Sequence, residues 1–253
     1  MGELGAVSRS RLYQVSSLVI RQRDLGEADR IVTLFTQERG KLSAVAKGVK
    51  RPRSKLASAL QLFVRARIQL AAGRSLEVVT QVDPVALHYH LRDDVNRYAH
   101  ACYVAELVDV LTEEGAPDGA LFQLVAATLD GLDGGADPAT LVRGFELKLL
   151  GRLGYGPELE TCVSCDAKVM AGRAGFSVAQ GGVLCRRCLR REGGGTLSSA
   201  AREAMRDLLE MSQEDLGRRR LSQTTRQELQ RVMRAFVDYR LERQLRSAAF
   251  LAQ

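Results

Sequence analysis

Four cysteines constrain the fold of this chain more than any other feature, because they form two CxxC pairs with nineteen residues between the pairs. The first pair is Cys162 and Cys165, and the second is Cys185 and Cys188. Each CxxC turn can direct two thiolates at one ion at about 2.3 Å, and two such turns complete the tetrahedron that Zn²⁺ prefers. Four thiolates leave no open position for water. The pattern therefore predicts one zinc ion with a structural role.

Two other uses of these cysteines fit the sequence less well. Two disulfides would require an oxidising compartment, and the start MGELGAVSRS contains no apolar signal-peptide stretch. A redox CxxC normally occurs once, at the start of a helix in a βαβ unit, and that context is missing. No apolar run approaches the ~20 residues that span a bilayer, so we expect a cytoplasmic protein with no membrane partner.

The first 83 residues have the period of β-structure. Their alternating or apolar runs are rich in Val, Ile, Leu and Thr, and glycines separate them. Short strands with no helix-length pattern between most of them predict a small closed barrel, which leaves no exposed strand edge. A polar, basic loop at residues 48–61 is long enough for a short helix. The expected strands are residues 13–23, 31–36, 41–46, 62–71 and 75–82.

After Asp83-Pro84, which is expected to end the β pattern, the apolar period becomes helical. Asp137 is expected to cap one helix at Pro138, and Ser198 to cap another. The expected helices run from about Leu91 to before Gly115, over 119–132 and 138–153, from Ser198, and over about 225–250. The chain is thus an α+β multidomain protein: a barrel at 1–83, a helical domain at 84–157 and 193–253, and an inserted cysteine module at 158–192.

The net charge of +7 is distributed unevenly. Residues 1–80 carry +9 and residues 81–160 carry −9, which suggests a first module directed at a polyanion. A solvated basic face without a partner is the alternative. Five cations lie within the nine residues 47–55, at the start of the polar loop, with no acid among them. Five phosphate contacts on a single strand predict a log–log salt slope of about −3.5. These cations are Lys47, Lys50, Arg51, Arg53 and Lys55.

Little else in the sequence suggests specific chemistry. The barrel region has only Tyr13, Phe35 and Phe63 as aromatic residues, so base stacking contributes little and a low sequence preference is expected. HExxH, GxSxG, a dinucleotide fingerprint and a complete phosphate-binding loop are all missing. We therefore expect no catalytic residues, no enzyme activity and no small-molecule substrate.

Two longer runs and the cysteines resemble the RecO family of recombination mediators in order and spacing. The runs are GEADRIVTLFTQERGKLSAVAKGVKRPRSKL at 26–56 and FELKLLGRLGYGPEL at 145–159. The resemblance implies an N-terminal OB-fold barrel, a helical domain and a zinc module. It also implies binding of single- and double-stranded DNA and annealing of complementary strands. With RecR, such a protein helps to load RecA onto DNA coated by single-strand-binding protein (SSB).

The resemblance also implies site residues in a cytoplasmic, nucleoid-associated repair protein. The acidic C-terminal tail of SSB is expected on the helical domain, where Arg143, Phe145, Lys148, Leu149 and Arg152 combine cations with apolar groups. Ordinary helix-surface charge around a core helix is the alternative for this cluster. An RNA- or ribosome-associated zinc protein without annealing activity is the alternative function. The DNA-binding positions of the family fall on Arg30, Lys41, Lys47, Lys50, Arg51, Arg53 and Lys55.

Overall fold

The structure is a computed structural model that describes residues 12–73, 75–170, 172–241 and 245–248. The described residues form two compact units. The barrel unit comprises the chain up to His88 together with Val108–Phe122, and the helical unit comprises Tyr89–Leu107 and the chain from Gln123 onward. Each unit is described by itself below.

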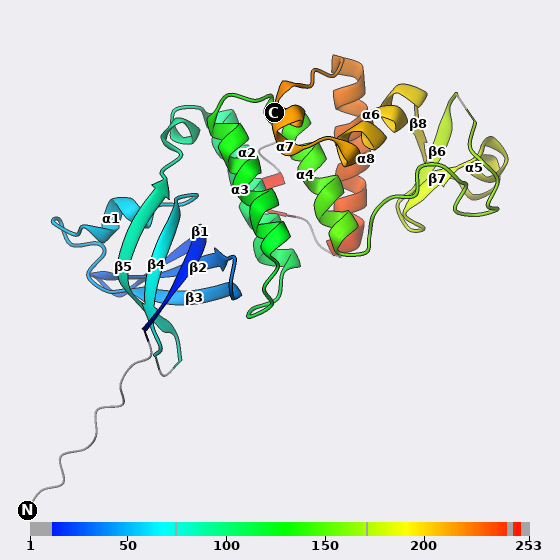
Figure 1. The fold of residues 1–253 in the computed structure, drawn as a ribbon. Helices are drawn as coiled ribbons and strands as arrows, with labels where there is room; N and C mark the ends of the chain where they lie inside the picture. Colours follow the sequence, from blue (N-terminus) through cyan, green and yellow to red (C-terminus); the bar gives the residue numbers. More distant parts are fainter. Residues whose placement is uncertain (1–11, 74, 171, 242–244, 249–253) are drawn as a thin grey trace, which may run out of the picture. The chain divides into compact units, whose positions relative to one another are not determined.

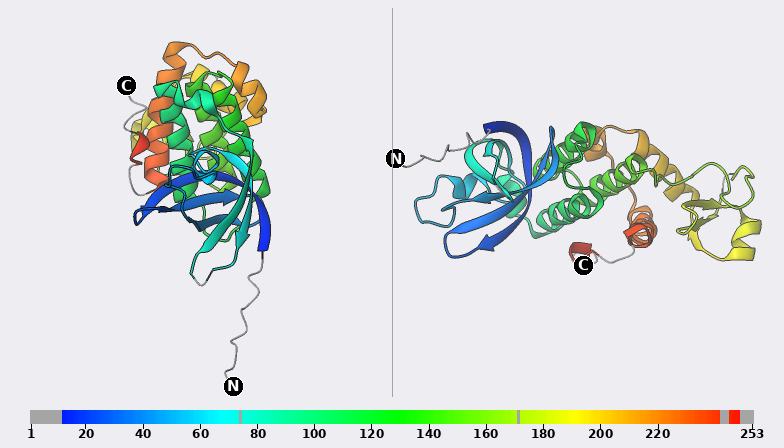
Figure 2. Two further views of the ribbon diagram at one scale, coloured as in Figure 1. Left: turned by 90° about the vertical axis from the view of Figure 1, so that its left-hand side faces the viewer. Right: turned by 90° about the horizontal axis from the view of Figure 1, so that it is seen from below.

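The barrel unit contains a closed five-stranded barrel, which confirms the expected fold (Figure 1). The strand order is β1-β2-β3-β5-β4, and only the β3–β5 pair is parallel. Val19, Val32, Leu34 and Ile68 are completely buried inside it. Figure 2 shows β1, the longest strand, curving around the barrel. The strands are β1 Leu12–Leu25, β2 Asp29–Thr36, β3 Gly40–Ala46, β4 Arg65–Ala71 and β5 Glu77–Ala86.

Two strand boundaries differ from those expected. β4 begins at Arg65 rather than at residue 62, because Phe63 has a φ of 69°, outside the β region. β5 continues through Asp83-Pro84 to Ala86, so the expected break at this dipeptide is wrong. The β4–β5 register shifts between Arg65 and Ala66, next to Pro84, and a bulge of this kind tolerates a residue without an N–H group.

One glycine of the barrel unit is required by a close approach of two chain segments. Gly40 begins β3 with a φ of 65°, and a Cβ atom there would lie 2.2 Å from the carbonyl oxygen of Ala116. Only glycine fits this position. The polar loop after β3 ends in the short helix α1, Leu56–Ala59, where a short helix was expected.

The helical unit is built around α4, which packs against α6, α7 and α8. Asp137 caps α4, since its Oδ2 accepts a hydrogen bond of 3.1 Å from Thr140 N, and Ser198 caps α6 in the same way through Ala201 N. Both caps were expected. No helix among the described residues is long and apolar enough to cross a membrane. The helices are α2 Val95–Leu111, α3 Gly119–Asp133, α4 Pro138–Arg152, α6 Ser199–Glu210, α7 Gln213–Arg218 and α8 Gln223–Leu241, and α2 follows a 3₁₀ turn at Tyr89–Arg92.

The cysteine-rich segment forms a small sheet and a short helix (Figures 1 and 2). The expected hairpin is present as β6 Ala174–Ser177 and β7 Gly182–Leu184, and α5 spans Arg186–Glu192. A third strand, β8 Gly195–Leu197, pairs with β6 and was not expected, and neither was α7. The last expected helix is too long. α8 ends at Leu241, residues 245–248 are not α-helical, and the remainder of the expected range lies outside the described residues.

Candidate metal centre and nucleic-acid interface

The sulfur atoms of the two CxxC pairs converge on one point. All four lie within 4.8 Å of one another, and Cys165 Sγ lies 3.8 Å from Cys185 Sγ. A tetrahedron with metal–sulfur bonds of about 2.3 Å has an edge of about 3.8 Å, so this separation fits a bound metal ion. None of the cysteines forms a disulfide, and Cys162 and Cys188 are buried. The cluster could therefore hold one metal ion in a closed shell of four thiolates.

Backbone N–H groups and neighbouring side chains give the thiols of the cluster different pKa values. Burial raises the pKa of Cys162, but backbone N–H groups, including those of Cys185 and Ser164, outweigh it and lower this pKa to about 6. A hydrogen bond with Ser164 lowers the pKa of Cys188, but burial and the other thiols outweigh it and raise this pKa to about 11. The lower pKa favours the thiolate form of Cys162 at neutral pH, whereas Cys188 would have to lose its proton to bind a metal ion.

Two arginines of α5 contact the cluster. Arg191 Nη2 lies 4.0 Å from Cys188 Sγ, and a hydrogen bond with Cys165 raises the pKa of Arg187. These guanidinium groups offset thiolate charge. Arg186 and Arg190 are exposed, and within the described part of the chain neither forms an ion pair.

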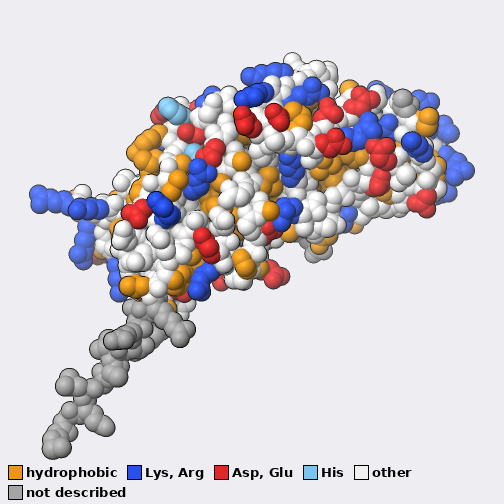
Figure 3. Space-filling model, viewed as in Figure 1, with side chains coloured by type: hydrophobic (Ala, Val, Ile, Leu, Met, Phe, Trp, Pro, Cys, Tyr) orange, Lys and Arg blue, Asp and Glu red, His pale blue; other side chains and the backbone are white. Residues whose placement is uncertain are grey.

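The basic loop between β3 and α1 is a strongly exposed cationic segment of the barrel unit. All five of its cations are exposed, and Figure 3 shows Lys and Arg side chains gathered where this loop projects. Among the described residues, Lys47, Arg51, Arg53 and Lys55 have no acidic partner. The loop leaves the barrel through a turn at Gly48, whose N–H donates to Asp29 Oδ1 at 2.7 Å. The structure thus presents four unpaired cations on one short segment.

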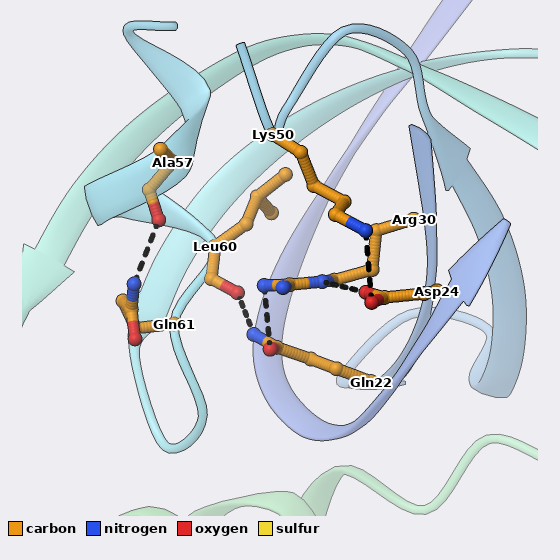
Figure 4. A network of polar contacts seen from close by, with 7 residues as sticks. All are labelled: Gln22, Asp24, Arg30, Lys50, Ala57, Leu60 and Gln61. Atoms are coloured by element: carbon orange, nitrogen blue, oxygen red, sulfur yellow. Dashed lines mark hydrogen bonds and ion pairs between the residues drawn. The ribbon is translucent and has the colours of Figure 1, made fainter. Parts of the chain in front are cut away.

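Arg30 and Lys50 have a different environment, since both contact Asp24 (Figure 4). Arg30 Nε lies 3.2 Å from Asp24 Oδ1, and Lys50 Nζ lies 2.9 Å from Asp24 Oδ2. The hydrogen bond from Lys50, followed by that from Arg30, lowers the pKa of Asp24. These two cations are accessible but already share one carboxylate.

Lys41 does not lie on the surface as the resemblance implied. Its side chain is largely buried, Nζ donates to the backbone oxygen of Asp109, and Nζ lies 3.5 Å from Asp109 Oδ1. Arg21 Nη1 contacts the other carboxylate oxygen of Asp109 at 3.1 Å. Lys41 therefore fastens β3 to the C-terminal part of α2 inside the barrel unit, so its assignment as a DNA-binding residue is corrected.

A groove of about 800 Å³ on the barrel unit contains cations that the sequence pattern did not single out together. Arg23 and Arg39 line it, and the guanidinium carbon of Arg39 lies 4.0 Å from the ring centre of Tyr13. Arg39 precedes Gly40 in the β2–β3 turn. Its position beside a turn glycine is the sequence feature that could have pointed to it. The groove also contains Glu38 and Glu77, so its charge is mixed.

The site expected for the SSB tail is not formed by the predicted residues. Arg143, Phe145 and Leu149 are buried inside the helical unit, because α4 is surrounded by α6, α7 and α8. Arg143 Nη2 pairs with Glu146 Oε1 at 2.9 Å, and Lys148 Nζ donates to the backbone oxygen of Met211. Of the five predicted residues, only Arg152 is exposed. The cluster is the interior of a helix bundle and not a docking surface.

Taken together, the fold and the cluster define a modular protein in which a five-stranded OB-type barrel precedes a helical unit with a four-cysteine cluster that could hold a metal ion. Two family models match the chain: "Recombination protein O N terminal" at residues 11–88 and "Recombination protein O C terminal" at 92–249. The chain belongs to the RecO family.

Similar proteins place this family in DNA repair. The chain is 42% identical to the DNA repair protein RecO of Symbiobacterium thermophilum, over 95% of this chain and 96% of that protein. It is 38% identical to the DNA repair protein RecO of Pelotomaculum thermopropionicum, over 95% of this chain and 94% of that one. The protein of Roseiflexus sp. with the same name is 39% identical, over 96% and 86% of the two chains. The role of the family is therefore DNA repair.

Proposed function

We propose that this protein is a recombination mediator that binds single- and double-stranded DNA through its barrel and anneals complementary strands. With RecR, it helps to load RecA onto single-stranded DNA coated by SSB. The observation that carries the DNA-binding part is the basic loop with its four exposed, unpaired cations, in a chain that belongs to a DNA repair family. The RecR, RecA and SSB parts rest on family membership. The DNA-binding residues are Arg30, Lys47, Lys50, Arg51, Arg53 and Lys55.

Charge is sufficient to explain annealing without an enzymatic step. Two complementary strands repel each other, and a basic surface that neutralises phosphates on both strands lowers this cost. The barrel unit has few aromatic side chains, and Phe35 is completely buried, so bases are left free to pair. Such a protein needs no catalytic residue and consumes no nucleotide.

The proposed metal is one structural Zn²⁺ held by Cys162, Cys165, Cys185 and Cys188. Tetrahedral four-thiolate shells suit this ion, and a closed shell leaves no position for reactive water. We propose a separate role for each of three parts of the chain. Residues 1–83 bind DNA, residues 158–192 form the zinc module, and 84–157 with 193–253 form the helical scaffold.

The triple variant Lys50→Ala/Arg51→Ala/Arg53→Ala is expected to bind single-stranded DNA at least about tenfold more weakly at low salt. The slope of its affinity against salt concentration is expected to flatten by about 2, because three phosphate contacts are lost. Its annealing of complementary oligonucleotides, with and without SSB, is expected to slow accordingly. The measurements are a salt titration of binding to a labelled oligonucleotide and an annealing time course on DNA and on RNA strands.

A matched control removes the same charge elsewhere. Arg218, Arg219 and Arg220 are consecutive and exposed in the helical unit, so Arg218→Ala/Arg219→Ala/Arg220→Ala should leave DNA binding close to wild type. Equal losses in the two triple variants would show a general charge effect and contradict the loop assignment. Binding to RNA without DNA annealing would favour an RNA-associated protein instead.

A further inference from the structure

Two cations of the proposed DNA-binding surface converge on a single acidic side chain. Arg30 extends from β2 and Lys50 from the basic loop, and their donor groups reach different oxygens of the Asp24 carboxylate, at 3.2 and 2.9 Å (Figure 4). Asp24 is on β1 directly across from Arg30 in the β1–β2 register. One anion is thus held between two cations on neighbouring segments of the barrel unit.

Contacts other than Asp24 hold the side chain of Arg30 and the backbone of Lys50. Gln22 Oε1 accepts a hydrogen bond of 3.0 Å from Arg30 Nη1, and the Gln22 amide group donates to the backbone oxygen of Leu60. Lys50 N donates to the backbone oxygen of Ala28 at 3.0 Å, which fixes the loop to the β1–β2 turn. The Arg30 guanidinium and the backbone of Lys50 would therefore stay in place if the carboxylate moved away, and the Lys50 side chain would still reach this position.

The chemistry of this position suits a phosphate as well as a carboxylate. Guanidinium and ammonium donors bind both groups through charge-assisted hydrogen bonds, and the carboxylate carries the same single charge as a phosphodiester. The Asp24 side chain is 57% exposed, so it can swing into solvent without unfolding the strand. The Arg30 and Lys50 side chains are 26% and 31% exposed, which leaves their charged ends within reach of a ligand.

We propose that Asp24 is an internal competitor for DNA: it occupies a subsite for one backbone phosphate between Arg30 and Lys50, and a bound strand displaces it. This inference rests on the proposed DNA binding and specifies one of its contacts. An internal competitor weakens DNA binding and makes release of the strand easier. This suits a protein that must release two complementary strands once they have annealed. It also hides part of the cationic surface from small anions.

Asp24→Asn is expected to bind a labelled oligothymidylate about three- to tenfold more tightly at low salt, since exposed ion pairs of this kind contribute modestly. The salt slope is expected to steepen only slightly, because Arg30 and Lys50 engage phosphates in both complexes and the difference is the salt-screened ion pair with Asp24. The advantage should therefore shrink as the salt concentration rises. The gain should vanish in the Arg30→Ala/Lys50→Ala background, where Asp24→Asn has no cations to release.

Asp83→Asn is the matched control, because Asp83 is exposed on β5 of the same unit and contacts Gln81 rather than a cation. A similar gain in Asp83→Asn would overturn the proposal, since it would reveal only a change in net charge. Unchanged or weaker binding by Asp24→Asn would also overturn it, because Asp24 would then serve to position Arg30 and Lys50.

If wild-type protein and the loop triple variant bind DNA equally, the proposed function itself fails. If the triple variant binds more weakly and Asp24→Asn is neutral, only the competitor role fails.

Discussion

Removal of the proposed zinc ion from the cysteine cluster is expected to unfold residues 158–192 as a module. Structural zinc in small domains contributes on the order of 10–16 kcal/mol of folding free energy. The module has two strands of only three and four residues and a helix of seven, a core too small to persist without a metal crosslink. Cys188→Ser, which removes a buried ligand, is expected to give the same result as a strong chelator. The measurements are the metal-to-protein ratio and limited proteolysis of the module.

Cys102→Ser is the control for loss of a thiol, because Cys102 is half-buried on α2 and is not part of the cluster. This variant should retain a metal-to-protein ratio near that of the wild type. A ratio near zero in freshly purified wild-type protein would contradict the structural role of the metal. Resistance of the module to proteolysis after chelation would contradict its dependence on the metal.

Arg143→Ala is expected to lower the free energy of unfolding by about 3–5 kcal/mol, the usual loss when one partner of a buried ion pair is removed. Glu146 has no exposed surface, and its Oε1 accepts from Arg143 at 2.9 Å and from the hydroxyl of Tyr103 at 2.5 Å. Its other carboxylate oxygen, Oε2, is buried and has no hydrogen-bond partner among the residues that the structure describes. In the variant, the negative charge of Glu146 would therefore be left without a cationic partner in the core of the helical unit. Denaturant unfolding measures this loss.

The loss should also depend on pH. Burial raises the pKa of Glu146 above its usual 4.5, although Arg143 and Tyr103 oppose the shift. The folded state thus binds the proton more tightly than the unfolded chain, so the contribution of this group to stability increases as the pH falls through the folded-state pKa toward 4.5. Arg143→Ala removes an opposing interaction and raises this pKa further. The variant should therefore be most destabilised at neutral and alkaline pH.

Two further variants make this result specific. Arg218→Ala removes an exposed arginine that pairs with Glu214, and surface pairs of this kind contribute at most about 1 kcal/mol. Arg143→Ala/Glu146→Gln removes the stranded charge and should recover part of the lost stability. A loss in Arg143→Ala that did not change with pH and was not relieved by Glu146→Gln would show that packing, and not charge, is responsible.

Local sequence patterns predicted the features that depend on neighbouring residues. Period-two alternation predicted the five barrel strands, and the side chains of Asp137 and Ser198 predicted two helix starts, because strands and caps are governed by interactions over a few residues. The CxxC spacing predicted the cysteine cluster for the same reason: each turn positions its own two sulfur atoms.

Features that depend on distant partners were not predictable. Lys41 reads as a surface cation, but its partner Asp109 is 68 positions away in the chain. Arg143 and Glu146 read as the polar face of an amphipathic helix, yet both are buried, because α6, α7 and α8 pack against α4. β8 has only three residues and follows a run of glycines, so its strand pairing depends on β6 and not on its own pattern.

The closure of the barrel has a consequence for its motion. β1 and β2 share eight register pairs, whereas the parallel β3–β5 junction has only two, Ala44 with Glu77 and Val45 with Val78. Local opening begins where the fewest cooperative contacts must break, so amide protons at this seam should exchange with solvent before those of β1 and β2. Glu77 also borders the groove that contains Arg23 and Arg39. Breathing of the barrel at this seam would thus widen the groove while the long antiparallel strands remain closed.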